Sequence, residues 1–448
     1  MQKFRVTGGK ELSGIIEPQG SKNEALQIVA SSIIVQKLKI INCPNILDIR
    51  NLLIILENAG SKIKWEKQNN KNILYIDTTK IDFEYFKSDE YLKLSEKLRG
   101  SLMLIGPLLS RFGKAYIPSV GGDKIGKRPI DTHINGFLKV GASIQKDERG
   151  FEYLELLENN IKKDRQIILE EPSVTGTANI IFALTKKINK VDGLVKNISL
   201  YNAACETYVS QLVSLLNKSG MNILGIGSNL LNINGDMQNI FETEIEHTVL
   251  PDFIEVASFI SLAMATKSEI TIKNAGVANL DMTIKMFEKL GCRFEIIGDD
   301  IKVLKQESYT IQKMHDGSMM TIYSAPWPMV SPDILSVGIV AALQSEGSVL
   351  FHEKMYEARM FFVDKLVAMN GSIVLCDPHR VVVNGNNWKE RLLARNMTSP
   401  DIRAGIALLI AALGAGGISV IDNVDQIDRG YENIEMRLAA LGADIVRV

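Results

Sequence analysis

The chain has 448 residues, of which 46% are hydrophobic and 23% are charged, and its formal net charge is −1. This composition is typical of a soluble globular protein with more than one domain. It provides no overall charge that would attract nucleic acid or an acidic membrane, so we expect neither as a partner, and any anion site must be a local cluster of lysine and arginine side chains.

In chain order, the most regular feature is a short sequence pattern that occurs six times. Each copy is an apolar-patterned helix that ends at a glycine and is followed by the start of an apolar strand. The glycines are Gly60, Gly141, Gly220, Gly291, Gly371 and Gly442. We predict that each one takes the left-handed conformation that ends a helix, which glycine adopts without steric cost. A period of roughly 75 residues indicates six similar units, each longer than the usual repeat of a solenoid.

A second set of helices alternates with the glycine-capped ones. These segments carry apolar residues at helical spacing and few charges, so we expect them to be buried. They are predicted at Asn23–Gln36, Glu96–Leu109, Ser173–Lys187, Asp252–Thr266, Asp333–Gln344 and Asp401–Leu413. Strands that end in a turn asparagine are predicted at Asn42, Asn202, Asn274 and Asn423. Helices and strands mixed within a repeat predict an α/β fold, and three repeats per domain place a boundary near residue 245.

Charged and polar residues recur at the starts of the buried helices and in two loops. The set includes Lys22, Asn23, Arg99, Asp252, Asp333, Arg359, Asp401, Arg403 and Arg429. Taken singly, an aspartate after a proline can be a helix N-cap, and a lone cation can be a solvated surface residue. Buried helix starts carry unpaired N–H groups and the positive end of the helix dipole, so the joint pattern predicts an anion site.

The segment from Gly121 to Lys127 matches the G-x-x-x-x-G-K pattern of a phosphate-binding P-loop. The next residue is Arg128 rather than the serine or threonine that would hold magnesium, and Pro129 stands where a helix should continue. We therefore reject a P-loop nucleotidase.

The cysteines and histidines give no metal-binding pattern. The four cysteines lie far apart without a CxxC pair, and the five histidines form no HExxH spacing. We expect no metal and no cofactor. The cysteine pattern fits a reducing, cytoplasmic compartment, and the first residues contain no apolar run that would indicate a signal peptide.

Eight motifs, in order along the whole chain, resemble those of the UDP-N-acetylglucosamine enolpyruvyl transferase family. They are GSKNEAL, GGDKIGKRPIDTHI, PSVTGTAN, VLPDFIE, APWPMVSPD, YEAR, SPDIRAG and QIDRGYENIEMRLAALGA. The compact GSKN motif resembles this family more than the related shikimate-phosphate enolpyruvyl transferases. The resemblance implies two inverse α/β barrel domains of three repeated units each, with the active site between them. One domain is residues 22–246, with a mobile loop at about 119–128, and the other is 1–21 plus 247–448.

The resemblance also implies a reaction. The enolpyruvyl group of phosphoenolpyruvate is transferred to the 3-hydroxyl of UDP-N-acetylglucosamine, and phosphate is released. This is the first committed step of peptidoglycan synthesis, so cell wall biogenesis, cell shape, the cell cycle and cell division would depend on it. The sequence does not indicate an oligomeric state.

Residue roles follow from the matched motifs. Phosphoenolpyruvate carries about three negative charges near pH 7, so several cations must converge on it, and arginine suits bidentate contact. The implied cations are Lys22, Arg128, Arg359, Arg403 and Arg429, with Arg99 as a further active-site arginine. Asp333 matches the general base for the attacking hydroxyl, and Asn23 would hold the sugar. The uridine and diphosphate site would be lined by Arg128, Pro129, Ile130, Asp131, His133, Ser173 and Val174. We also expect Asp252 and Asp401 among the substrate-binding residues.

The general acid of the family is most often a loop cysteine, and Asp123 stands at that position here. An aspartate has a reference pKa of about 3.9 against about 8.5 for cysteine, so Asp123 can act as an acid only if loop closure desolvates it. Fosfomycin alkylates the family's loop thiol, so the resemblance implies that this chain is resistant.

Four positions depart from the family pattern, namely Thr175, Tyr208, Leu335 and Gln426. The departures gather on the acceptor side rather than the phosphoenolpyruvate side. Two alternatives therefore stay open: a paralogue that acts on another nucleotide or nucleotide sugar, and a non-catalytic nucleotide-sugar sensor.

Overall fold

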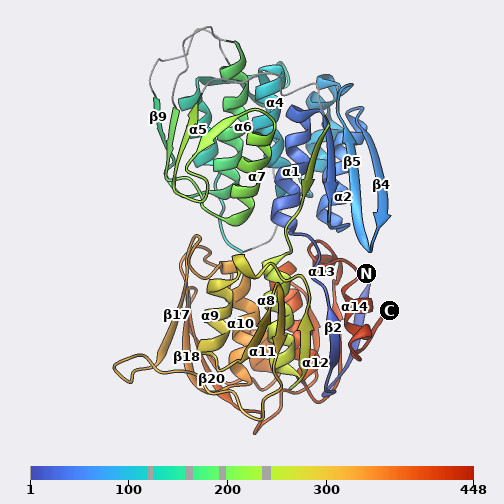
Figure 1. The fold of residues 1–448 in the computed structure, drawn as a ribbon, viewed down its shortest axis with the longest axis vertical. Coiled ribbons are helices and arrows are strands. Elements are labelled where there is room, and N and C mark those ends of the chain that lie inside the picture. The colour runs from blue at the N-terminus through green and yellow to red at the C-terminus, as the bar shows by residue number, and fades with distance from the viewer. Residues whose placement is uncertain (1, 120, 122–124, 157–164, 191–197, 235–243) are drawn as a thin grey trace. The chain divides into compact units, whose positions relative to one another are not determined.

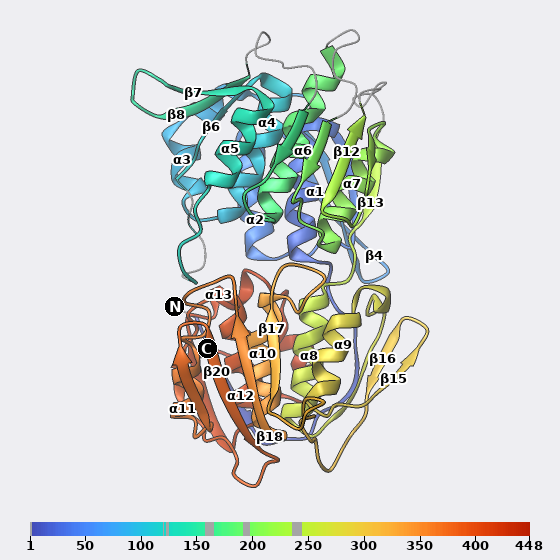
Figure 2. The same ribbon diagram turned by 90° about the vertical axis from the view of Figure 1, so that its left-hand side faces the viewer.

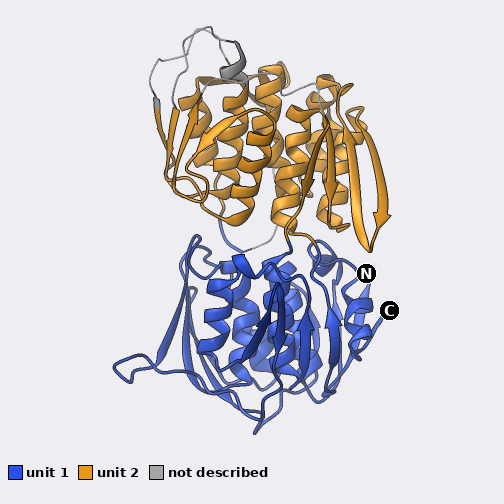
Figure 3. Cartoon of the chain, viewed as in Figure 1, with its two compact units in different colours: residues 1–19, 123–127, 251–448 blue, residues 20–122, 128–250 orange. Residues whose placement is uncertain are grey.

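The computed structural model describes residues 2–119, 121, 125–156, 165–190, 198–234 and 244–448. The chain divides into two compact units (Figure 3). Unit 1 comprises residues 1–19, 123–127 and 251–448, and unit 2 comprises residues 20–122 and 128–250. The N-terminal strands therefore belong with the C-terminal half of the chain.

Within the described residues, unit 2 contains three sheets around a group of helices (Figures 1 and 2). The sheets, in strand order, are β13 (Ile245–Thr248), β3 (Lys37–Ile41), β5 (Lys71–Asp77) and β4 (Lys62–Gln68); β6 (Lys114–Tyr116), β8 (Glu152–Leu156) and β7 (Ala142–Lys146); and β11 (Asn222–Leu224), β12 (Leu230–Asn234), β10 (Ile198–Tyr201) and β9 (Arg165–Ile168). The helices are α1 (Lys22–Val35), α2 (Leu47–Asn58), η1 (Phe83–Lys87), α3 (Asp89–Ser95), η2 (Arg99–Leu104), α4 (Ile105–Phe112), α5 (Asp131–Val140), α6 (Val174–Lys190) and α7 (Thr207–Lys218).

Unit 1 repeats this plan. Its described sheets are β21 (Asn396–Thr398), β22 (Gly417–Asp422), β1 (Lys3–Gly8) and β23 (Asp444–Arg447); β15 (Phe294–Ile297), β16 (Asp300–Val303), β14 (Glu269–Ile272) and β2 (Ser13–Ile16); and β17 (Met320–Ser324), β18 (Glu346–Glu353), β20 (Arg380–Asn386) and β19 (Ile373–Asp377). The helices are α8 (Phe253–Ala265), η4 (Val277–Asn279), α9 (Asp281–Lys289), α10 (Pro332–Leu343), α11 (Val363–Ala368), α12 (Ile402–Gly414), α13 (Asp425–Asp428) and α14 (Ile434–Ala440).

The four-stranded sheets share one pairing pattern. Each joins one parallel pair, such as β3 with β13 or β22 with β21, to two antiparallel pairs. Asn42, Asn202 and Asn423 follow the inner strand of the parallel pair with φ between 57° and 60°. Their side-chain amides donate to the carbonyl just beyond the parallel neighbour, at 2.9–3.0 Å. The predicted asparagine turns therefore also tie adjacent strands together.

The predicted inner helices are found as α1, α6, α8, α10 and α12, with ends within a few residues of the prediction. Every residue of α8 and α12 is buried, which places these helices inside the ring of sheets. The predicted helix Glu96–Leu109 is wrong at its start, because η2 occupies 99–104 before α4 begins. Ser101 uses both its amide and its hydroxyl to bond the carbonyl of Leu98 three residues back, which favours the tighter 3₁₀ turn.

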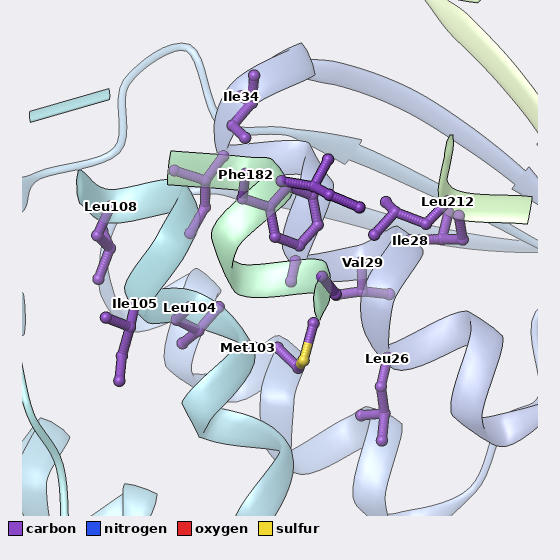
Figure 4. Close-up of a cluster of buried hydrophobic side chains, with 14 of the residues drawn as sticks. Leu26, Ile28, Val29, Ile34, Met103, Leu104, Ile105, Leu108, Phe182 and Leu212 are labelled. Carbon is purple, nitrogen blue, oxygen red and sulfur yellow. The ribbon is translucent and has the colours of Figure 1, made fainter. Parts of the chain in front are cut away.

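Apolar side chains from the inner helices form the core of unit 2 (Figure 4). Leu26 and Val29 of α1 gather there with Met103 of η2, Leu108 of α4 and Phe182 of α6. Burial of this continuous apolar surface is the main source of stability for the unit. Among the helices that the structure describes, none combines the length and hydrophobicity of a membrane span.

Five of the six predicted capping glycines have the left-handed conformation, with φ between 93° and 102°. The prediction for Gly371 is wrong, because Asn370 takes that conformation instead, with φ 72°. Asparagine tolerates it better than most residues. Gly371 has a different role, since a Cβ there would lie 2.8 Å from the Leu366 carbonyl oxygen.

Close packing of α12 against α8 gives a test of this arrangement. A Cβ on Gly414 would lie 2.6 Å from the Ala265 carbonyl oxygen, whereas nothing lies within 4 Å of one on Gly416. We expect Gly414→Ala to lower the free energy of unfolding by about 1–3 kcal/mol because the helices must separate. Gly416→Ala is the control and should change it little. Urea unfolding measures the free energy of unfolding of both variants. Equal values for Gly414→Ala and Gly416→Ala would contradict this packing of α12 against α8.

Candidate functional site

In unit 1, Asp333 bridges two arginines at the start of α10. Its Oδ1 lies 2.5 Å from Nη2 of Arg359, and its Oδ2 lies 3.5 Å from Nη2 of Arg403. The N-cap of α10 is Ser331, whose hydroxyl accepts from the Asp333 amide at 3.3 Å. The N-cap interpretation is therefore wrong for Asp333, whose carboxylate is directed to the arginines.

The two arginines are buried cations with donors to spare. Arg359 is 5% exposed and Arg403 is 4% exposed. Among the described residues, no acceptor lies within hydrogen-bonding distance of Nε or Nη1 of Arg359, or of Nη1 of Arg403. Burial opposes the charge on Arg403, but the Asp333 carboxylate and its other neighbours outweigh burial and raise its pKa. Buried donors without acceptors are costly, so this cluster is suited to an anion.

Asp252 and Asp401 cap the neighbouring inner helices. Asp252 accepts from the Ile254 amide at 3.0 Å at the start of α8. Asp401 accepts from the amides of Arg403 and Ala404 at 2.8 and 2.9 Å at the start of α12. The N-cap interpretation therefore holds for both aspartates, and the Asp401 cap fixes the backbone from which Arg403 extends.

Arg429 lies in a braced loop of unit 1, directly after α13. Its Nη1 donates to Oε1 of Gln426 at 2.9 Å. The Gln19 side chain donates to the Gly430 carbonyl at 2.8 Å and accepts from the Glu432 amide at 2.7 Å. The Gln19 contacts hold the backbone that follows Arg429, and Gln426 holds the Arg429 side chain.

In unit 2, Lys22 opens α1 beside Asn23, which is half-buried. The Lys22 ammonium lies 2.6 Å from Oδ2 of Asp48, and both side chains are buried. Asp48 lies in the first turn of α2. The carboxylate therefore holds a buried cation in place at the first inner-helix start.

A second group of predicted residues meets around the starts of η2, α5 and α6 in unit 2. Arg99 donates through Nη2 to the Arg128 carbonyl at 2.7 Å, and Pro129 and Ile130 lead from there to Asp131, the first residue of α5. Ser173 precedes α6, where its hydroxyl accepts from the Gly176 amide at 3.1 Å, and Val174 is the first residue of that helix.

His133 is buried beneath this group. Its Nε2 lies 3.0 Å from Oγ1 of Thr175, and its Nδ1 lies 3.1 Å from Nδ2 of Asn179. Burial, together with the nearby Arg99 charge, lowers the pKa of His133 to about 4. The imidazole is therefore neutral at physiological pH.

Asp123 lies outside the described residues, so the structure does not place the predicted acid. The next part of its loop belongs to unit 1, where the Ile125 carbonyl accepts from the Ala358 amide at 3.1 Å. Ala358 directly precedes Arg359. No group of three or more histidine, cysteine, aspartate or glutamate side chains in the described ranges is placed to hold a metal ion.

Known proteins match the whole chain. The family model of EPSP synthase (3-phosphoshikimate 1-carboxyvinyltransferase) matches residues 6–438. Relatives named UDP-N-acetylglucosamine 1-carboxyvinyltransferase are 48% identical in Bacteroides fragilis (strain YCH46) and 46% identical in Porphyromonas gingivalis, with 100% of both chains covered. A relative of the same name in Borreliella burgdorferi is 40% identical and covers 100% of this chain and 99% of its own. The chain belongs to the UDP-N-acetylglucosamine 1-carboxyvinyltransferase family.

Solved structures agree on the fold of this transferase family. The enolpyruvyl transferase NikO from Streptomyces tendae superposes with a TM-score of 0.82 at 20% identity, covering 100% of this chain and 99% of its own. EPSP synthase from Acinetobacter baumannii gives a TM-score of 0.68 at 16% identity, with full coverage of both chains. The predicted family and the predicted α/β fold of repeated units are both confirmed.

Sequence reasoning missed three residues that hold members of the candidate site in place. Asp48 pairs with Lys22, Gln19 braces the Arg429 loop, and Asn179 bonds His133. A charged residue inside the apolar segment NILDIRNLL was a usable signal for Asp48. The sequence gives no comparable signal for the other two, because each contact is long-range.

The neutral state of His133 predicts a pH dependence of stability. Its pKa falls from 6.5 to about 4 on folding, so the unfolded chain binds a proton below pH 6.5 that the folded chain excludes. Stability should therefore decrease as the pH falls from 6.5 towards 4, by up to roughly 3 kcal/mol from this residue. Urea unfolding of the wild type and of His133→Gln across this range isolates the effect. Identical pH slopes for the two proteins would contradict the prediction.

Proposed function

We propose that this chain transfers the enolpyruvyl group of phosphoenolpyruvate to the 3-hydroxyl of UDP-N-acetylglucosamine and releases phosphate, as the first committed step of peptidoglycan synthesis. The shared name of its full-length relatives supports the reaction. The observation that carries the proposal is the buried pair Arg359 and Arg403. Both pair with Asp333, and both keep N–H donors that have no hydrogen-bond partner among the described residues. Such a cluster suits a small, highly charged donor anion.

The residue roles are proposed as follows. Lys22, Arg128, Arg359, Arg403 and Arg429 bind phosphoenolpyruvate, with Arg99 nearby, while Asn23 holds the sugar. Residues 129–131, His133, Ser173 and Val174 form the uridine and diphosphate site, and Asp252 and Asp401 support binding through the helix starts that they cap. The proposed functional domains are residues 22–246 and residues 1–21 plus 247–448.

The chemistry needs one acid and one base. Asp123 gives a proton to the methylene carbon of phosphoenolpyruvate, and the 3-hydroxyl oxygen bonds to the adjacent carbon while Asp333 takes its proton. The Asp123 carboxylate then takes a proton back from the new methyl group, and the double bond is restored as phosphate leaves. The arginines stabilise the phosphate and carboxylate charges throughout. The product would support cell wall biogenesis, cell shape and division, and we propose a cytoplasmic location.

Phosphate release tests the reaction. The wild type should release phosphate from phosphoenolpyruvate only when UDP-N-acetylglucosamine is present. Asp333→Asn should lower kcat by about 100-fold or more, because the hydroxyl loses its base. Asp364→Asn, at an exposed aspartate paired with Lys365 in the same unit, is the control and should leave kcat unchanged.

Other outcomes separate the alternatives. Release only with a different nucleotide or nucleotide sugar would favour the paralogue, and binding without any release would favour the sensor. The Leu335 departure does not by itself favour the paralogue, because this side chain is fully buried within unit 1.

Fosfomycin tests the proposed loop acid. The wild type should stay active during incubation, because an aspartate offers no thiol for alkylation. Asp123→Cys should lose activity with time and gain one covalent adduct on the loop, as mass spectrometry would show. An adduct on the loop of the wild type would contradict the assignment.

A further inference from the structure

Glu353, the last residue of β18 in unit 1, holds the turn that leads to Arg359. Its side chain is fully buried. Oε2 accepts from the Ser324 hydroxyl at 2.8 Å, and Oε1 accepts from the amides of Met355 and Tyr356 at 2.7 and 3.1 Å. Three donors therefore converge on one carboxylate, and two of them belong to the turn.

The backbone of Glu353 is fixed as well. Its amide donates to the His379 carbonyl at 2.8 Å, and Nδ1 of His379 lies 2.9 Å from its carbonyl oxygen. Because that carbonyl can only accept, Nδ1 must carry the hydrogen and donate it. Ser324 is the register partner of Glu353 in the parallel pair of β17 and β18. The carboxylate is thus anchored to the sheet, and it anchors the turn in its place.

Tyr356 carries this constraint to Arg359. The Tyr356 carbonyl accepts from the Arg359 amide at 3.4 Å. The central carbon of the Arg359 guanidinium lies 5.2 Å from the centroid of the Tyr356 ring, which is within the range of a cation–π contact. Glu353 therefore fixes the residue that touches Arg359 through both its main chain and its ring.

The negative charge of Glu353 has no ion-pair partner in the described part of the chain, where no lysine, arginine or histidine nitrogen lies within 4 Å of the carboxylate. A glutamine could accept from the same two amides, and an unpaired buried charge is costly, so stability alone does not explain a glutamate here. Burial opposes the charge on Arg359, but the negative groups around it, Asp333 first and Glu353 among them, outweigh burial and raise its pKa.

We infer that Glu353 is a positioning residue for Arg359, which acts through Tyr356 and holds the guanidinium where its remaining donors can take an anion. Nε and Nη1 of Arg359 are the donors in question, since neither has an acceptor among the described residues. The inference rests on the proposed function, which assigns phosphoenolpyruvate to Arg359.

Steady-state kinetics of Glu353→Gln test the role. Glutamine keeps the size of the side chain and can still accept from both amides, but a neutral acceptor is weaker and carries no charge. The KM for phosphoenolpyruvate should rise about 10-fold, while the KM for UDP-N-acetylglucosamine changes by less than about twofold. Glu346→Gln is the matched control, at an exposed glutamate that begins the same strand and pairs with Lys389. It should change neither KM.

Two further measurements separate positioning from a structural role. In an Arg359→Lys background, Glu353→Gln should add less than about a twofold loss, because its effect passes through the guanidinium. The ¹⁵N resonance of Arg359 Nε, identified by its loss in Arg359→Lys, should shift in ligand-free Glu353→Gln and not in the control. This resonance reports the guanidinium environment without any substrate.

Ser324→Ala keeps the falsifying power if Glu353→Gln does not fold. It removes one donor and leaves the carboxylate charged, so the KM for phosphoenolpyruvate should rise about 2- to 10-fold, the range for an ordinary hydrogen bond.

Three results would overturn the inference. One is a lower melting temperature in Glu353→Gln with both KM values unchanged, which would show a purely structural role. The others are fully additive losses with Arg359→Lys and an unmoved Arg359 resonance. Failure of the proposed function looks different, since the resonance would still shift in Glu353→Gln while wild-type protein released no phosphate from phosphoenolpyruvate and UDP-N-acetylglucosamine.

Discussion

The structure of unit 1 depends on keeping two guanidinium groups charged inside a helix-filled interior. Removing a cation from water costs several kcal/mol, and a nearby carboxylate returns only part of that cost. Asp333 supplies the carboxylate for both Arg359 and Arg403, yet some of their donors stay without an acceptor in the described residues. The fold thus tolerates a locally unfavourable arrangement that a bound anion would relieve, as expected of a binding site.

The repeat explains how Asp333 comes to pair with the two arginines instead of capping its helix. Three inner helices of unit 1 begin with the same dipeptide, Pro-Asp, at Asp252, Asp333 and Asp401. In α8 and α12 the aspartate is the cap, whereas α10 begins two residues earlier relative to the dipeptide and is capped by Ser331. This shift of two residues places Asp333 in the first turn, where its carboxylate pairs with Arg359 and Arg403 instead of capping the helix. The same sequence element therefore provides two structural caps and one proposed catalytic base.

Local features of the fold were predictable, and long-range pairings were not. Helical periodicity located the buried inner helices, because each pattern spans neighbouring turns of one segment. The sequence does not decide whether Asn370 or Gly371 takes the left-handed conformation. Both residue types tolerate it, and the outcome depends on where the helix ends. Asp48 and Gln19 act on residues that the fold, not the sequence, brings to them.

Two of the four departures from the family pattern are hydrogen-bonded to predicted site residues. Gln426 bonds Arg429, and Thr175 bonds His133. A site that had lost its function would be under no constraint to build new hydrogen bonds onto its remaining charged and polar groups, and buried charges would be the first to disappear because they are costly. Arg403 is still present, buried and paired. The pattern is that of a site whose contacts were rearranged around retained charged and polar residues, which argues against a sensor without activity.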